Sequence, residues 1–332
     1  MNKEFIINDG CLEKYIGEGG DVIIPDEVEE IAPNAFERCV NLVSVSIPNN
    51  VYRIGEYAFA ECANLVSVKL PYNIDEISSG LFFGCTKLQN VNVPCGVKLI
   101  GDHAFSWCQS LTHIDLPDSI RSIGVCAFNT CTKLETIHLY DWITHIGEQA
   151  FAYCNSLKSV TVPGGFTFVD ANAFAFCNNL ESVTVPQGAV SLEFGAFAGC
   201  RKLKNVTVDE SVDLGGERIF QGCPCLADEN GFIIVNNILY EYLGKNIVVS
   251  IPDGVTRISE GAFDGCEQLN ELHIPDSVSC IGENAFDGRC SLTIFASVDS
   301  FAKEYAERNG IDFIFESSKS IQMQMIQYTC KQ

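Results

Sequence analysis

Three side chains that could bind a metal ion or transfer protons stand close together near the middle of the chain. His113 and Asp115 occupy alternate positions, and His138 follows at an equivalent place one sequence repeat later. Imidazole and carboxylate groups suit both kinds of chemistry, so a site here is one interpretation. Solvent-exposed side chains without such a role are the other. No nucleophile–base–orienter set accompanies them, so the sequence predicts a protein that is not an enzyme and holds no metal or cofactor.

Cysteine is the second residue type with reactive potential. The chain has 17 Cys, and ten of them recur at one position, three residues after a repeated Phe, from Cys39 to Cys266. There is no C-x-x-C pair. Neighbouring Cys in register could approach disulfide range, but side chains that point in the same direction give poor geometry. The column is interpreted as small buried side chains, and so many thiols favour a reducing or anaerobic setting.

Two polar columns are the places where a ligand would be recognised. They alternate with apolar residues, as outward positions of a strand do. Hydroxyls and amides dominate them, which suits a polar partner such as a glycan or an extended peptide. The alternative is that Ser and Thr merely tolerate a solvated sheet. The candidate partner-binding residues are Ser44, Ser46, Lys69, Asn90, Asn92, His113, Asp115, Thr136, His138, Ser159 and Thr161.

A strict repeat of 23 residues positions these columns. Phe recurs at each step from Phe36 to Phe220, with Cys three residues later and Leu three after that. Such a period predicts a solenoid, in which each repeat contacts only its neighbours. Within one repeat, Val45 and Ile47 alternate as a strand that Pro48 ends. A second inward segment follows, and then apolar residues at three-residue steps predict a short helical or 3₁₀ piece.

The ends of the array depart from the repeat. Residues 1–24 predict a β-hairpin cap with a turn at Asp9-Gly10, and residues 231–250 repeat its pattern and predict a second hairpin, as an insert. Nine repeats cover 25–230 and two more cover 251–296, eleven in all. Residues 297–316 predict a closing helix and strand, and 317–332 predict a disordered tail.

Charge and composition exclude several classes of partner. The net charge is −22, and acids concentrate in residues 1–37 and 208–316. An acidic chain without a basic stripe argues against nucleic acid. No apolar run is long enough to span a membrane, so membrane insertion is not expected. No signal peptide or anchor motif is evident, so the sequence by itself predicts a cytoplasmic location.

The unit Leu-x-x-Ile/Val-x-Ile/Leu-Pro-x-x-Val-x-x-Ile-Gly-x-x-Ala-Phe-x-x-Cys resembles the BspA-type (Treponema pallidum-type) leucine-rich repeat, from residue 24 to about 295. The resemblance implies an α/β leucine-rich-repeat solenoid, right-handed and curved, with a parallel sheet on its concave side and helical or 3₁₀ segments on its convex side. It also implies a surface-exposed or secreted bacterial protein, which differs from the location that the sequence alone predicts.

The function expected from these observations is a non-catalytic, adhesin-like binding module. The concave sheet would recognise a protein or a glycan of unknown identity. The alternative is a structural scaffold that associates with copies of itself or organises cytoplasmic partners. The two differ in the surface that they use, because a scaffold would require an apolar lateral patch.

Overall fold

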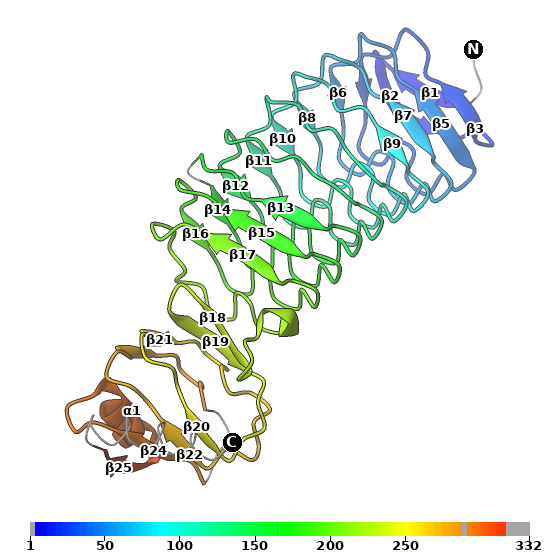
Figure 1. Ribbon diagram of the computed structural model, residues 1–332. Coiled ribbons are helices and arrows are strands. Elements are labelled where there is room, and N and C mark those ends of the chain that lie inside the picture. The colour runs from blue at the N-terminus through cyan, green and yellow to red at the C-terminus, as the bar shows by residue number, and fades with distance from the viewer. Residues whose placement is uncertain (1–3, 166, 287–290, 317–332) are drawn as a thin grey trace. The chain divides into compact units, whose positions relative to one another are not determined.

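The computed structural model describes residues 4–165, 167–286 and 291–316, and divides the chain into two compact units, Met1–Ile219 and Phe220–Gln332. Each unit is a stack of turns joined by parallel strands (Figure 1). The predicted tail, 317–332, lies outside the described residues.

In the first unit, one set of strands forms the ladder that the sequence predicts, here called the first ladder. Its strands are β3 (Gly20–Ile23), β5 (Leu42–Ser46), β7 (Ser67–Lys69), β9 (Asn90–Val91), β13 (Ser159–Thr161), β15 (Ser182–Val185) and β17 (Asn205–Val208). Between β9 and β13 only the bridge between His113 and Thr136 is formed. Partners are 23 residues apart along most of the ladder, as Val45 and Val68 are.

A second ladder of mostly two-residue strands runs beside the first, where the sequence predicts only an inward segment. It consists of β2 (Cys11–Tyr15), β4 (Glu30–Ile31), β6 (Arg53–Ile54), β8 (Glu76–Ile77), β10 (Leu99–Ile100), β11 (Ser122–Ile123), β12 (His145–Ile146), β14 (Phe168–Val169) and β16 (Ser191–Leu192). The strand β1 (Phe5–Asn8) pairs with β2 as the predicted hairpin cap. This cap covers the second ladder, whereas β3 is the end strand of the first ladder.

Apart from the 3₁₀ helix η1 (Pro224–Leu226) in the ninth repeat, the segments predicted as helical or 3₁₀ pieces are successive turns, so that prediction is wrong for the other repeats. In the first copy, the amides of Asn34, Phe36 and Arg38 donate to carbonyls of the next turn of the solenoid, at 2.7–3.1 Å. The amides between them donate within their own turn. Asn34 and Arg38 have φ of 58° and 60°, and these left-handed residues direct alternate amides toward the neighbouring turn. Because successive turns also place apolar residues three apart, the sequence pattern does not distinguish them from a 3₁₀ helix.

The Phe column forms a continuous stack at the centre of the first unit. Phe105, Phe128, Phe151 and Phe174 follow one another with ring centroids 5.0–5.2 Å apart and interplanar angles of 4–6°. All four are fully buried. The predicted ladder of identical side chains is therefore present, and each ring contributes a large buried apolar area.

The second unit repeats the same plan. Its hairpin consists of β18 (Phe232–Val235) and β19 (Ile238–Tyr242), with Asn236 and Asn237 at positive φ in the turn. Two ladders follow: β19, β21 (Arg257–Ile258) and β23 (Cys280–Ile281) in one; β20 (Val248–Ser250), β22 (Glu271–His273), β24 (Thr293–Ala296) and β25 (Asp312–Phe315) in the other.

The predicted closing helix is α1 (Phe301–Asn309). Ser300 is its N-cap and accepts a hydrogen bond from the amide of Lys303, and Gly310 ends it at φ 68°. The strand β25 then pairs in parallel with β24. Because β24 and β25 both extend the first type of ladder, the chain has about 13 turns rather than the predicted eleven repeats.

Candidate functional site

The predicted polar columns lie in register on the outward side of the first ladder. Ser44 is paired with Ser67, and Ser46 with Lys69. Further along the ladder, Ser159 and Thr161 are paired with Ser182 and Thr184. Ser44 and Ser46 are partly buried, and the other candidates, from Lys69 to Thr161, are exposed. The ladder therefore presents rows of hydroxyl and amide groups about 4.8 Å apart.

The histidines near the middle of this face contact different neighbours. The ring of His138 packs edge-on against Tyr140, with centroids 4.4 Å apart, and His113 lies 3.3 Å from the hydroxyl of its neighbour Thr112. Within residues 4–165, 167–286 and 291–316, no group of three or more His, Cys, Asp or Glu side chains could hold a metal ion.

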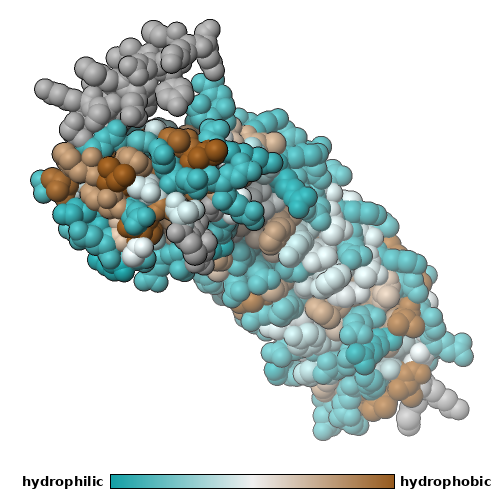
Figure 2. All heavy atoms as spheres, turned by 90° about the horizontal axis from the view of Figure 1, so that it is seen from below, coloured by the Kyte–Doolittle hydropathy of each residue, from teal (hydrophilic) through white to brown (hydrophobic). Residues whose placement is uncertain are grey.

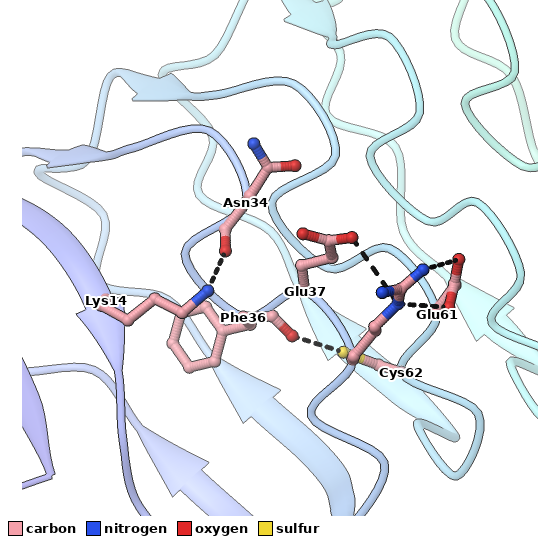
Figure 3. A network of polar contacts seen from close by, with 7 residues as sticks. Lys14, Asn34, Phe36, Glu37, Glu61 and Cys62 are labelled. Carbon is pink, nitrogen blue, oxygen red and sulfur yellow. Dashed lines mark hydrogen bonds and ion pairs between the residues drawn. The ribbon is translucent and has the colours of Figure 1, made fainter.

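The column cysteines have a specific structural role. The thiol of Cys62 donates to the carbonyl oxygen of Phe36, 3.1 Å away (Figure 3), and six later members of the column, from Cys85 to Cys200, repeat the contact at 3.1–3.3 Å. Burial raises the pKa of the Cys62 thiol to about 12. These thiols are thus hydrogen-bond donors, and burial disfavours the thiolate of Cys62, the form that acts as a nucleophile or metal ligand.

A polar network joins the N-terminal hairpin to the first turns (Figure 3). The ammonium group of Lys14 donates to the carbonyl oxygen of Asn34 at 2.9 Å, and the guanidinium of Arg38 lies 2.8 Å from the carboxylate of Glu61. The Arg38–Glu61 pair lowers the pKa of Glu61. These groups are exposed, so the network positions the cap rather than a ligand.

The sequence analysis missed a basic strip on the edge beside the first ladder. Six of the eight Lys and Arg residues between 85 and 207 occupy three neighbouring columns there, within three positions of the repeated Leu. We call this set the lysine strip: Lys87, Lys133, Lys158, Arg201, Lys202 and Lys204. Only two acids, Glu135 and Glu181, share those columns in this range. The expectation of a chain without a basic stripe is therefore wrong for this edge.

A shallow groove lies along part of the lysine strip. It has a volume of about 260 Å³ and is lined by Glu135, Ser156, Lys158, Asn179, Glu181 and Lys202. Lys204 forms an ion pair with Glu181 at 2.8 Å. The hydrogen bond from Lys204, its charge and the charges of Lys202 and Lys158 lower the pKa of Glu181. The sequence does contain a signal for the lysine strip: Lys and Arg recur at repeat positions that hold few Asp or Glu residues.

Two further properties concern the helices and the surface of the molecule. No helix that the structure describes combines the length and the apolar character that a membrane crossing needs. The face presented in Figure 2 is hydrophilic over most of its area, and its hydrophobic residues form separate groups. A polar partner in water is consistent with such a surface.

Comparison with known proteins agrees with this fold. The family model for the BspA type leucine rich repeat region matches residues 7–115, 98–227 and 234–329. A leucine rich cell surface protein from Faecalibacterium prausnitzii A2-165 is 27% identical, with a TM-score of 0.51 over 92% of this chain and 96% of that chain. The pneumococcal vaccine antigen PcpA is 16% identical, with a TM-score of 0.53 over 92% of each chain, and shows the fold alone.

No curated protein matches the chain in sequence. The family model nevertheless covers most of the residues, and both the 23-residue register and the Phe stack agree with it. The chain belongs to the BspA type leucine-rich repeat family.

Proposed function

We propose that the protein is a non-catalytic, adhesin-like binding module whose first ladder contacts a polar partner, either a protein or a glycan. The observation that carries the proposal is the in-register row of Ser, Thr and Asn side chains on that ladder from Ser159 to Thr207, all exposed except the partly buried Ser182. Regularly spaced hydroxyl and amide groups can hydrogen-bond a repetitive ligand without burying much apolar surface. The similarity to a protein described as a cell surface protein supports the same function.

A test of this proposal uses two matched double variants. T161E/T184E places carboxylates on the outward side of the first ladder, whereas S122E/T144E adds the same two charges in and next to the second ladder. Binding to a glycan array and to immobilised matrix proteins would be measured for both. Loss of binding in T161E/T184E alone supports the proposal, and equal binding by both variants contradicts the assignment of this face.

The location of the chain is a separate question, which protease treatment of intact cells addresses. Cleavage of the chain on intact cells, with a cytoplasmic marker left uncut, would support an adhesin-like role. Protection of the chain until the cells are lysed would contradict that role and direct the search to intracellular partners.

A scaffold that associates with itself is the second candidate, favoured by one observation. The strand β25 is the end strand of its sheet, and Ile314 and Phe315 are 49% and 58% exposed on it. Exposed apolar edge strands are prone to pair with other chains. Sedimentation of the protein with and without I314K tests this candidate, because a scaffold would lose its oligomeric state in the variant.

A further inference from the structure

We propose that the lysine strip binds a linear anionic polysaccharide, one that bears carboxylate or sulfate groups along its length. The proposal deepens the proposed function, on which it rests in one respect: the chain is taken to be a binding module. It places the contact on the edge beside the first ladder rather than on the ladder's outward side.

The first argument is the separation of charge on this part of the solenoid. Between residues 85 and 207 the lysine strip and its two acids carry net charge +4, while the remaining residues carry two bases and seven acids. The whole chain carries −22, so a local excess of positive charge runs against the overall composition. At physiological ionic strength charges are screened over about 8 Å, so an approaching anion interacts mainly with the strip.

The second argument is the spacing and the availability of the bases. Equivalent residues on neighbouring turns are about 4.8 Å apart, and the bases lie on four of the six turns between Leu88 and Leu203, so they can contact an extended polymer at intervals along its length. The side chains of Lys133, Lys158, Arg201 and Lys202 make no ion pair or hydrogen bond to any residue that the structure describes. Lys204 is paired with Glu181, but both side chains are about half exposed, and such a pair stabilises the fold little.

The third argument is the chemistry of the groove, which favours a polysaccharide over an acidic protein segment. Apart from charged groups, its lining is the hydroxyl of Ser156 and the amide of Asn179. Protein partners usually rely on aromatic or aliphatic anchors that fill apolar pockets, and this groove offers none among its lining residues. Sugar hydroxyls, in contrast, can hydrogen-bond hydroxyl and amide groups while their acidic substituents contact the lysines.

The test measures binding of the full chain to immobilised polysaccharides by biolayer interferometry at two salt concentrations. Polygalacturonate provides carboxylates, chondroitin sulfate adds sulfates, and fully methyl-esterified polygalacturonate is the uncharged control. We expect binding to at least one anionic polymer, no binding to the esterified polymer, and weaker binding at higher salt. The two anionic polymers distinguish the substituents that the strip accepts.

Two variants of equal charge locate the contact. K158E/K202E reverses two bases of the lysine strip, and K98E/R121E reverses two exposed bases of the same unit that lie outside the strip, on earlier turns. We expect an affinity loss of at least about tenfold in K158E/K202E and of no more than about twofold in K98E/R121E. Circular dichroism would confirm that both variants fold.

Three outcomes would overturn the proposal: absence of binding to both anionic polymers at low salt, equal losses in the two variants, or tighter binding of a poly-glutamate peptide than of either polysaccharide. If the strip fails but T161E/T184E still abolishes binding of another ligand, the proposed function stands and only this inference falls. If neither surface binds anything, both fall.

Discussion

The thiol of Cys131 donates a hydrogen bond to the carbonyl oxygen of Phe105, which lies 3.1 Å away and 26 residues earlier in the chain. The same oxygen accepts the amide of Cys108 at 3.0 Å. The hydrogen bond therefore joins the turn that contains Cys131 to the preceding turn, at a residue of the Phe column. It explains why the column uses Cys, since Ala and Val would fill part of the space but cannot donate.

Replacing a column cysteine should destabilise the solenoid even when the volume is kept. C131V removes the donor, and the carbonyl of Phe105 keeps only the Cys108 amide as a partner, so we expect the free energy of unfolding to fall by about 0.5–1.5 kcal/mol. Urea unfolding followed by circular dichroism measures the change. C95A, at an exposed cysteine, should change it by less than about 0.5 kcal/mol. A C131V protein as stable as the wild type would show that the thiol contributes only bulk.

The column thiols should also make the protein sensitive to alkaline pH. Burial raises the pKa of Cys62 to about 12 and raises those of Cys85, Cys108 and Cys154 strongly, whereas a thiol in the unfolded chain ionises near pH 8.5. The folded state thus keeps protons that the unfolded state loses. This contribution to stability is complete below about pH 8.5 and is lost as the pH rises toward the folded pKa, by up to about 1.4 kcal/mol per pH unit for each thiol.

The measurement is the urea midpoint between pH 8 and 11 for the wild type, C62A and the surface control C95A. We expect a shallower decline for C62A, because one shifted thiol is gone, and an unchanged decline for C95A. Parallel declines in all three proteins would mean that other groups cause the alkaline loss. A second readout is labelling with iodoacetamide at pH 8, in which Cys95 should react long before any column thiol.

Much of this fold could be predicted from the sequence, because the repeat makes one turn's pattern hold for all turns. The inward Val and Ile, the Phe stack and both hairpins follow from periodicity and from turn residues such as Asp9-Gly10. The turns after each repeated Gly could not be distinguished from a 3₁₀ helix. Their backbone depends on residues in the left-handed conformation, and these residues, such as Tyr57 and Gln149, are of types that seldom adopt it.

The candidate site was harder to predict than the fold, because surface positions carry no periodic constraint. The polar columns followed from strand alternation, but whether they bind a ligand is not encoded in alternation. The lysine strip can be recognised only once the structure places residues near the repeated Leu on one edge. Lys158 and Lys202 are examples. The net charge of a long segment conceals the strip, because it adds these bases to acids that lie on other faces.

Two residues after the Phe of the column the backbone is left-handed. Substitutions at these positions should therefore have opposite effects on stability, depending on whether the natural residue is Gly. Thr130 has φ 60° and Gly84 has φ 71° at equivalent positions. A left-handed conformation costs a β-branched residue about 1–2 kcal/mol, so T130G should raise the free energy of unfolding by about 1 kcal/mol and G84A should lower it by a similar amount. The urea midpoint measures both changes, and a destabilised T130G would show that the Thr130 side chain contributes more than its backbone strain costs.

A stronger effect is expected at Gly199 in the same column. A Cβ added there would lie 2.5 Å from the ring of Phe176, which stacks on Tyr153 with centroids 4.9 Å apart. G199A should therefore be more destabilising than G84A. Since the obstacle is the ring, G199A should cost less stability in an F176A background than in the wild type. Equal effects of G84A and G199A would argue against this steric account.

The buried pair at the end of the second unit should hold β25 in place. His273 Nδ1 lies 2.6 Å from Glu316 Oε2, both side chains are less than 9% exposed, and the His273 ring stacks on Phe295. Removal of one partner of a buried pair leaves the other without compensation and costs about 3–5 kcal/mol. E316A should therefore expose the amides of β25 to hydrogen exchange, whereas E304A, on the first turn of α1, should not.

The double variant H273F/E316A, which retains an aromatic ring against Phe295, should restore part of the protection, because no polar group is then left unpaired at this site. Unchanged exchange in E316A would mean that the backbone bond from Glu316 to Ala296 is sufficient to hold the strand.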